Sequence, residues 1–357
     1  MSKPEQLFAY IGSYAEPDQP GVYACRYDVQ SGKLELTSQI DGLKNPTFLD
    51  VDPNRSTLYA IAEGANEDGS KIGIAAAYDI DRDTGTLRLR NVEPTTPAPT
   101  CHLLLDRSRR SLIVSSYHGG MVGMSPLDKE GGIGPASDIK QHAGKSVLPV
   151  QSQPRAHSVT IDRNNRFAVA CDLGLDKLIV YRLDPDACRL IPHNETKTTP
   201  GAGPRHGVFH PSGAFFYVIN ELNASIIAYA YDEHQGQLNE IQTVPTLPTD
   251  YEGSNACADI HISPDGQFLY GSNRGHDSIV VYRIDTVTGL LQYVEHVPAG
   301  GKHPRNFAVS PDGRFVLVAN RDTDNIAVFR RDEDTGRLTA TGSELPVSKP
   351  VCIKFLQ

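Results

Sequence analysis

The chain has 357 residues, of which 39% are hydrophobic and 22% are charged, and its formal net charge is −9. This composition is typical of a folded globular protein and argues against disorder and against nucleic acid as a partner. No apolar stretch approaches the roughly 20 residues that a membrane-spanning helix needs. The first residues, MSKPEQLFAYIG, lack the basic segment and the apolar core of a signal peptide. We therefore expect a cytoplasmic protein that binds neither nucleic acid nor membranes.

One pattern recurs along the chain: an extended start, a turn of the Pro-Asp-Gly type, an apolar strand that ends in a polar residue, and a second apolar strand that ends in Asp. In chain order its copies begin at Pro46, Pro99, Pro154, Pro204, Cys257 and Pro304, and a shortened copy begins at Pro350. These starts lie 46 to 55 residues apart, which suits one blade of a β-propeller. The cleanest copy, from Pro304, reads PRNFAVSPDGRFVLVANRDTDNIAVFRRD.

The strands and turns of each copy have recognisable chemistry. Runs such as FVLVAN and IAVFRR are rich in Val, Ile and Phe, which favour strands. Turns such as SGKL, TGTL, TGLL and TGRL supply the glycine that a tight hairpin needs. The part missing from the last copy matches the N-terminal segment LFAYIGSYAEPDQPGVYACRYD.

We therefore predict an all-β fold, a seven-bladed β-propeller of four-stranded antiparallel blades. The N- and C-terminal strands are expected to share one blade, and a single domain is expected to span residues 1–357. Two stacked β-sandwiches would not explain seven copies in phase. Two longer Gly- and Pro-rich stretches, 118–153 and 245–255, are expected to be functional loops or plain insertions.

Polar residues mark the end of the second strand in each blade. In chain order they are Ser13, Glu63, Tyr117, Asp172, Glu221, Arg274 and Arg321. In an antiparallel blade this end lies at the same face as the start of the innermost strand. Those starts carry a second polar set, namely His102, Arg155, His157, Arg205, His206, Arg305 and Asn306. We predict that both sets meet at one mouth of a central channel and form a pocket of arginine, carboxylate and imidazole groups, although a polar rim can also simply tie the blades together.

Other reactive groups have no pattern that indicates a site. The six cysteines include no CxxC pair, the histidines show no metal-ligand spacing, and the serine-hydrolase, P-loop and Rossmann motifs are absent. We therefore expect no metal ion and no cofactor. The histidines at 118, 142, 193, 234 and 296 fall in predicted loops or at strand ends and are expected at the surface.

Four segments resemble a known family. They are AHSVTID with CDLGLDKLIVYRLD, GPRHGVFHPSGAFFYVINEL, ISPDGQFLYGSNRGHDSIVVYRID and GKHPRNFAVSPDGRFVLVANRDTDNIAVFR. They resemble the lactonase family of seven-bladed propellers, which contains the propeller-type 6-phosphogluconolactonases and the related carboxymuconate-lactonizing enzymes. The resemblance covers nearly the whole chain and is strongest from about residue 154 to 332.

The resemblance implies a catalytic group of His157, Arg205, Glu221 and Arg274, which stand in AHSV, GPRH, NEL and SNRGHDS. The substrate-binding candidates at the same predicted mouth are Arg155, Asp172, His206, Arg305 and Arg321, and the three arginines among them could bind a 6-phosphate.

The activity implied is hydrolysis of a sugar lactone, with 6-phospho-D-glucono-1,5-lactone as the expected substrate. This reaction needs a general base for the attacking water, donors for the oxyanion and an acid for the departing ring oxygen. Glu221 or His157 is expected to be the base and the other the acid, in an order that the sequence leaves open. Arg205 and Arg274 are permanently charged donors.

Other readings remain open. A carboxymuconate-type lactonizing enzyme would bind carboxylates with the same arginines and would move a proton at carbon with His157 or Glu221. A non-catalytic binding platform predicts that Glu221→Gln leaves every activity unchanged. A calcium-dependent gluconolactonase would lose activity with a chelator, but the sequence shows no convincing ligand set. We expect a monomer or weak homo-oligomer that acts on a sugar lactone or another anionic lactone.

Overall fold

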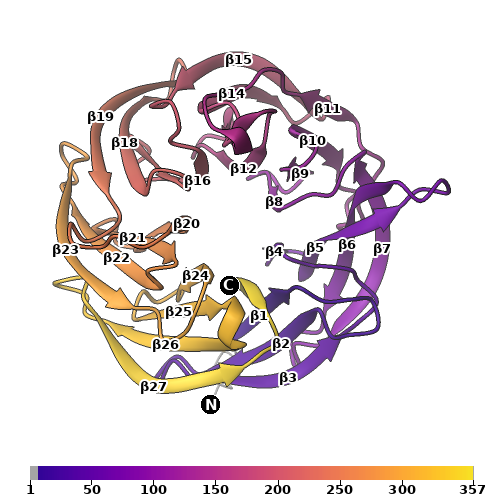
Figure 1. Cartoon of the computed structure of the whole chain (residues 1–357). Coiled ribbons are helices and arrows are strands. Elements are labelled where there is room, and N and C mark those ends of the chain that lie inside the picture. The colour runs from indigo at the N-terminus through magenta and orange to yellow at the C-terminus, as the bar shows by residue number, and fades with distance from the viewer. Residues whose placement is uncertain (1–6, 357) are drawn as a thin grey trace.

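A computed structural model describes residues 7–356 of the chain, and these residues form 28 strands in seven four-stranded antiparallel sheets. The sheets follow one another around a ring, with the lowest-numbered strand of most blades nearest the centre (Figure 1). The predicted seven-bladed propeller is confirmed. Within this part of the chain no helix is long and apolar enough to cross a membrane. The expected absence of a signal peptide rests partly on residues 1–6, and these residues lie outside the described range.

The strands of the first four blades, each written from the inside outward, are β28 (Pro350–Leu356), β1 (Leu7–Ser13), β2 (Val22–Tyr27), β3 (Leu34–Ile40); β4 (Leu49–Asp52), β5 (Thr57–Ala65), β6 (Lys71–Ile80), β7 (Leu87–Thr96); β8 (His102–Leu105), β9 (Ser111–Ser116), β10 (Met121–Pro126), β11 (Asp138–Gln141); β12 (Ala156–Ile161), β13 (Phe167–Asp172), β14 (Lys177–Asp184), β15 (Arg189–Lys197). The other three blades are β16 (Pro204–Phe209), β17 (Phe215–Asn220), β18 (Ser225–Asp232), β19 (Gln237–Pro245); β20 (Ala256–Ile262), β21 (Phe268–Arg274), β22 (Ser278–Ile284), β23 (Leu291–Pro298); β24 (Pro304–Val309), β25 (Phe315–Asn320), β26 (Asn325–Arg331), β27 (Leu338–Pro346).

The ring is closed by a blade that contains both ends of the chain. β28 pairs with β1 in antiparallel register, from Phe8 opposite Leu356 to Gly12 opposite Cys352. The sequence predicted this pairing from the shortened last copy. Closure covers the edge of β1 that faces the centre of the ring, which would otherwise be an unpaired template for aggregation.

Neighbouring blades are joined by a repeated contact at the face where the second strands begin. The Tyr217 hydroxyl in β17 donates to the carbonyl of Gly289 at 2.9 Å, and Tyr10, Tyr59 and Tyr270 make the same bond to Gly85, Gly131 and Gly336 of the next blade. Gly289 has φ of +74° and packs on Phe215. The glycine of the turn between the outer strands therefore serves both the turn and the contact with the neighbouring blade.

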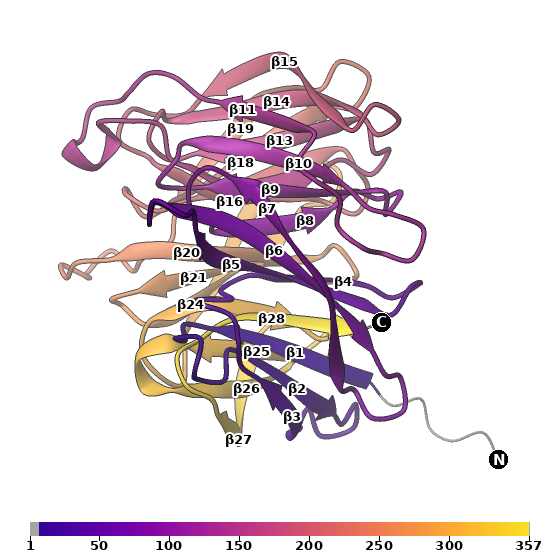
Figure 2. The ribbon, with the colours of Figure 1, turned by 90° about the vertical axis from the view of Figure 1, so that its right-hand side faces the viewer.

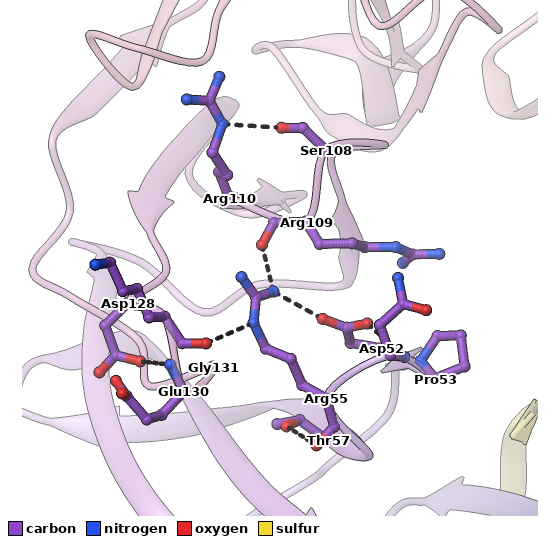
Figure 3. Close-up of polar contacts among 12 residues, drawn as sticks. Asp52, Pro53, Arg55, Thr57, Ser108, Arg109, Arg110, Asp128, Glu130 and Gly131 are labelled. Carbon is purple, nitrogen blue, oxygen red and sulfur yellow. Dashed lines mark hydrogen bonds and ion pairs between the residues drawn. The ribbon is translucent and has the colours of Figure 1, made fainter.

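Polar side chains reinforce the same face between the second and third blades (Figure 3). Arg55, in the turn between β4 and β5, donates to the carboxylate of Asp52 at 2.8 Å and to the Arg109 carbonyl at 2.6 Å. Its Nε donates to the Lys129 carbonyl at 3.0 Å. These bonds explain why a polar turn can tie two blades together without forming a ligand site.

The stretch 118–153, expected to be a loop or an insertion, instead contains the two outer strands of the third blade. β10 pairs with β9 over six residue pairs, and β11 pairs with β10. The sequence GGMVGM has three glycines and no alternation of polar and apolar residues. This pattern does not predict a strand. A short 3-10 helix, η1 (Pro149–Gln151), precedes β12, and another, η2 (Arg321–Thr323), follows β25.

Candidate active site

The innermost strands of four successive blades contain a β-bulge near their start. The pairing of β12 skips His157, that of β16 skips Arg205 and that of β24 skips Arg305. The pairing of β20 skips Ala258 and Asp259. A bulge bends the strand and redirects the side chain of the extra residue. Candidate residues that are adjacent in sequence therefore reach different places at the same mouth of the propeller.

Glu221, the residue after β17, is held by two arginines on a single carboxylate oxygen. Its Oε2 lies 2.9 Å from Nε of Arg205 and 2.8 Å from Nη2 of Arg274. Arg205 comes from the same blade, whereas Arg274 ends β21 in the next blade. Both guanidinium groups also donate to backbone carbonyls of β20, at 2.5 to 3.0 Å. The three side chains form what we call the Glu221 clamp.

The charges in the clamp are strongly coupled. Burial raises the pKa of Glu221, but the charges of Arg274, Arg205 and Arg305 outweigh it, so that the net pKa is lowered. Arg205 is 2% exposed, and burial together with Arg274 and Arg305 lowers its pKa to about 9. At neutral pH the carboxylate is therefore ionised and the arginines remain protonated. The clamp has more positive than negative charge, which suits an anionic ligand or intermediate.

His157 is neutral under the same conditions. Its side chain is buried. This burial is the main reason, and the charge of Arg205 the next, why the pKa of His157 lies well below the usual range. A neutral imidazole keeps one nitrogen free to accept a proton. Its Nδ1 is buried and has no hydrogen-bond partner among residues 7–356, and its ring packs edge-on against Tyr117 at 5.6 Å between centroids.

A cavity of about 310 Å³ is lined by His157, Glu221 and Arg274, whereas Arg205 does not line it. Its size is within the range of small-molecule sites. The lining residues are Tyr14, Asn45, Thr47, Glu63, Pro99, Thr100, Cys101, Tyr117, His118, His157, Glu221, Arg274 and Arg305. Sequence reasoning missed several of them. Thr47 and Thr100 could have been found, because they follow Pro46 and Pro99 as Arg205 follows Pro204.

The thiol in this cavity is not a suitable nucleophile. Cys101 contacts the carbonyl of His157 through Sγ at 3.2 Å, and burial raises its pKa to about 11. A protonated thiol attacks carbonyl carbon poorly. Among the described residues no group of three or more His, Cys, Asp or Glu side chains is arranged to hold a metal ion.

Arg305 differs from the clamp arginines because its charge is not matched. Within residues 7–356 its guanidinium makes no hydrogen bond and no ion pair, and it lies 5.7 Å from the centroid of the Tyr14 ring. It lines the cavity together with Glu221 and His157. A free guanidinium in a cavity is well suited to bind phosphate or carboxylate.

The structure places the other two candidate arginines differently. Arg155 does not line the cavity; it lies 4.8 Å over the Tyr117 ring and donates to the Val150 carbonyl at 2.5 Å. Arg321 lies in an adjoining groove of about 580 Å³, which shares Tyr14 with the cavity, and it pairs with Asp322 at 2.6 Å.

Asp172 and His206 do not line the cavity. Asp172 is fully buried, and its Oδ2 lies 2.6 Å from Nδ1 of His142. His142 is therefore buried rather than at the surface as expected. His206 is turned toward a smaller chamber of about 170 Å³, and its Nδ1 lies 2.7 Å from Oδ1 of Asp259. The bulge explains the second case, because it directs Arg205 and His206 to different levels of the strand.

Comparison with known proteins gives one consistent result. The family profile described as "Lactonase, 7-bladed beta-propeller" matches residues 8–355. The 6-phosphogluconolactonase of Bacillus subtilis is 34% identical over 98% of this chain and 99% of its own. The 6-phosphogluconolactonase of Formosa agariphila is 35% identical over 84% of this chain and 85% of its own. The structure of the periplasmic gluconolactonase of Pseudomonas aeruginosa superposes with a TM-score of 0.92 at 31% identity, covering 99% of each chain.

Proposed function

The chain belongs to the lactonase family of seven-bladed β-propellers and is a lactone-hydrolysing enzyme, and we propose that its substrate is 6-phospho-D-glucono-1,5-lactone, which it converts to 6-phosphogluconate. The observation that carries this proposal is the Glu221 clamp facing a neutral His157 in one cavity of sugar size. The relatives named 6-phosphogluconolactonase support the choice of substrate. The cytoplasmic location and the oligomeric state stay predictions from the sequence.

We assign the general base to His157 rather than to Glu221. The arginines lower the pKa of Glu221 and occupy its Oε2, so this carboxylate is a weak base and cannot act as an acid near neutral pH. His157 is neutral and can take the proton of the attacking water. A negatively charged tetrahedral intermediate would offset the arginine charges that disfavour imidazolium, so the same ring can then deliver the proton to the departing ring oxygen.

Arg274, which lines the cavity, supplies the donor for the oxyanion, and the buried Arg205 adds positive charge beside the shared carboxylate of Glu221. Their backbone bonds and their shared carboxylate fix both guanidinium groups before substrate arrives. Donors that are already oriented stabilise developing charge without reorganisation in the transition state. In this assignment Glu221 holds both guanidinium groups in place, and no separate acid is needed.

Arg305 provides the binding site for the 6-phosphate. It is a cavity cation with no ion-pair partner among residues 7–356, and a phosphate would give it charge-assisted hydrogen bonds. The overall charge of −9 gives an anionic substrate no long-range attraction. Binding must therefore depend on local arginines such as this one.

The test is proton release on a pH-stat from freshly prepared glucono-1,5-lactone and its 6-phosphate, with spontaneous hydrolysis subtracted. We expect wild-type enzyme to accelerate hydrolysis of the phosphorylated lactone and His157→Gln to lose the acceleration. Equal rates on both lactones would replace the phosphorylated substrate by a broader sugar lactone. No acceleration of either lactone would contradict the proposed function, and muconate-type lactones would be tested next.

A further inference from the structure

Three histidines from neighbouring innermost strands lie side by side, with His157 lining the cavity and His206 and His102 lining the smaller chamber. The ring centroids of His157 and His206 are 5.2 Å apart, and those of His206 and His102 are 5.6 Å apart. Each ring has one buried nitrogen without a hydrogen-bond partner among residues 7–356: Nδ1 of His102, Nδ1 of His157 and Nε2 of His206. Buried polar atoms are nearly always paired. Three unpaired nitrogens in adjacent rings therefore call for an explanation.

The tautomer of His206 follows from its contact with Asp259. Nδ1 of His206 lies 2.7 Å from Oδ1 of this carboxylate. Burial raises the pKa of Asp259, but hydrogen bonds from His206 and His261 help to hold it well below its usual range, so that the carboxylate stays ionised and can only accept. Nδ1 of His206 must therefore carry the proton. Burial and Arg205 lower the pKa of His206 to about 4, so the ring is neutral and Nε2 is a free acceptor.

We propose that Asp259 and His206 are positioning residues that fix His157 as a base, with Nε2 of His206 accepting the Nδ1 proton of His157. The two nitrogens that would pair are the ones left without partners. A centroid separation of 5.2 Å allows imidazole nitrogens that face each other to come within hydrogen-bond reach. With its proton fixed on Nδ1, His157 presents the bare Nε2 as the base. This inference rests on the proposed function for its catalytic meaning.

A structural role for Asp259 is the competing explanation. Its Oδ2 accepts from Nδ2 of Asn306, and Nε2 of His261 lies 2.9 Å from the same oxygen. These bonds connect the strands β16, β20 and β24. A purely structural role predicts that replacing Asp259 changes stability but not the proton position on His157.

The variant Asp259→Asn separates the two explanations. Oδ2 faces two donors, Asn306 and His261, whereas Oδ1 faces one backbone N–H, that of Ile260 at 3.0 Å, beside His206. The larger number of donors at Oδ2 should hold the new amide oxygen there and turn its NH2 group toward Nδ1 of His206. His206 would then carry its proton on Nε2 and donate to Nδ1 of His157. His157 would in turn carry its own proton on Nε2, and the base would be lost.

The proton position is read directly by nitrogen–hydrogen NMR of enzyme labelled with ¹⁵N-histidine, in which protonated and bare ring nitrogens resonate far apart. The chain has 12 histidines, and the signals of His157 are identified from their absence in His157→Gln. We expect Nδ1 to carry the proton in wild type and Nε2 to carry it in Asp259→Asn. The kcat of Asp259→Asn should fall by about 10²- to 10⁴-fold, the usual contribution of a general base.

Two control variants test specificity. Asn306→Ala removes a bond to the other oxygen of Asp259, and His102→Phe removes the second neighbour of His206; both should leave the His157 proton on Nδ1. A wild-type proton on Nε2 of His157 would overturn the positioning role, as would an unchanged His157 proton in a folded Asp259→Asn enzyme whose His206 carries its proton on Nε2. The NMR result stands even if neither lactone is hydrolysed, so a failure of the positioning role is distinguishable from a failure of the proposed function.

Discussion

Arg274 reaches across a blade boundary to Glu221, with Nη2 and Oε2 2.8 Å apart and both side chains largely buried. Glu221 follows β17 and Arg274 ends β21, so the pair connects two sheets as well as two charges. An ion pair in such a place is costly to break, because the remaining partner stays buried and unmatched. The clamp is therefore both part of the candidate active site and part of the joint between blades.

Glu221→Gln tests both roles. We expect a loss of about 3 kcal/mol in the free energy of unfolding, because two buried guanidinium groups lose their counter-charge. We also expect kcat to fall by about 10²- to 10³-fold, as for the loss of an oriented oxyanion donor. Urea unfolding and the pH-stat assay measure the two effects.

The matched control is Glu63→Gln, because Glu63 lines the same cavity and its ion pair is with the exposed Lys71 at 3.4 Å. This exposed pair should contribute less than about 1 kcal/mol. Equal effects of the two substitutions would contradict a special role for Glu221.

Arg305→Met tests the phosphate site. The free guanidinium should contribute about 1.5 to 3 kcal/mol through bonds to a charged group, so KM for the phosphorylated lactone should rise by about 10- to 100-fold. The KM for the unphosphorylated lactone should hardly change. Arg321→Met is the control, since Arg321 pairs with Asp322 outside the cavity. A larger rise in KM for Arg321→Met would move the phosphate site to the adjoining groove.

The blades could be predicted because their signals are local. Strand-forming residues and turn glycines repeat with a period of 46 to 55 residues, and no distant contact is needed to recognise them. The strand-end rule also placed Glu221 and Arg274 at one mouth, because antiparallel order alone fixes that face. These two residues do meet there.

The rest of the site depends on contacts that spacing does not encode. Asp172 obeys the strand-end rule, yet His142 from a poorly recognised segment binds it away from the cavity. Arg155 follows a proline, as Arg305 does, but it stacks on Tyr117 while Arg305 stays free in the cavity. The bulges that create these differences arise from strand register in three dimensions.

Gly289→Ala tests the contact between blades. At φ of +74° a side chain is strained, and an added Cβ would lie 2.4 Å from Cδ1 of Phe215. We expect a loss of about 2 to 4 kcal/mol in the free energy of unfolding, from backbone strain and overpacking together. Gly42 also has a positive φ, of +89°, but nothing lies within 4 Å of its added Cβ. Gly42→Ala should therefore cost about 1 kcal/mol from strain alone, and equal losses in denaturant unfolding would show that the packing is unimportant.

The rate at acid pH tests the neutral His157. Burial and the arginines hold the pKa of this ring well below its usual range, so the base stays unprotonated as pH falls through about 6.5. We expect kcat/KM for unphosphorylated glucono-1,5-lactone to stay level from about pH 7.5 to about pH 5.5, the range where an ordinary histidine would lose about tenfold. With the unphosphorylated substrate, no phosphate group titrates in this range, so the pH profile of kcat/KM reports on the enzyme. A decline centred near the ordinary histidine pKa would contradict the assignment.

The buried histidines also make the fold sensitive to acid. Burial and Arg205 lower the pKa of His206 to about 4, while in the unfolded chain it is about 6.5. Between these pH values the unfolded state binds more protons than the folded state. The contribution of His206 to the free energy of unfolding is therefore fully present above about pH 6.5 and is lost as the pH falls toward 4. His206 alone accounts for about 3 kcal/mol over this range, at 1.36 kcal/mol per unit of pKa.

The variant His102→Phe measures how much the protonation of one buried histidine contributes to this acid sensitivity. Burial holds the pKa of His102 well below its usual range, its ring packs on Phe48 at 4.3 Å between centroids, and its Nδ1 has no partner within residues 7–356. Phenylalanine keeps the aromatic contact and removes the titrating group. The unfolding free energy of the variant, measured with urea at several pH values, should fall less steeply below about pH 6.5, by up to about 1.4 kcal/mol per pH unit. Parallel curves for the two proteins would show that His102 becomes protonated in the folded state, and would remove it from the groups that make the fold sensitive to acid.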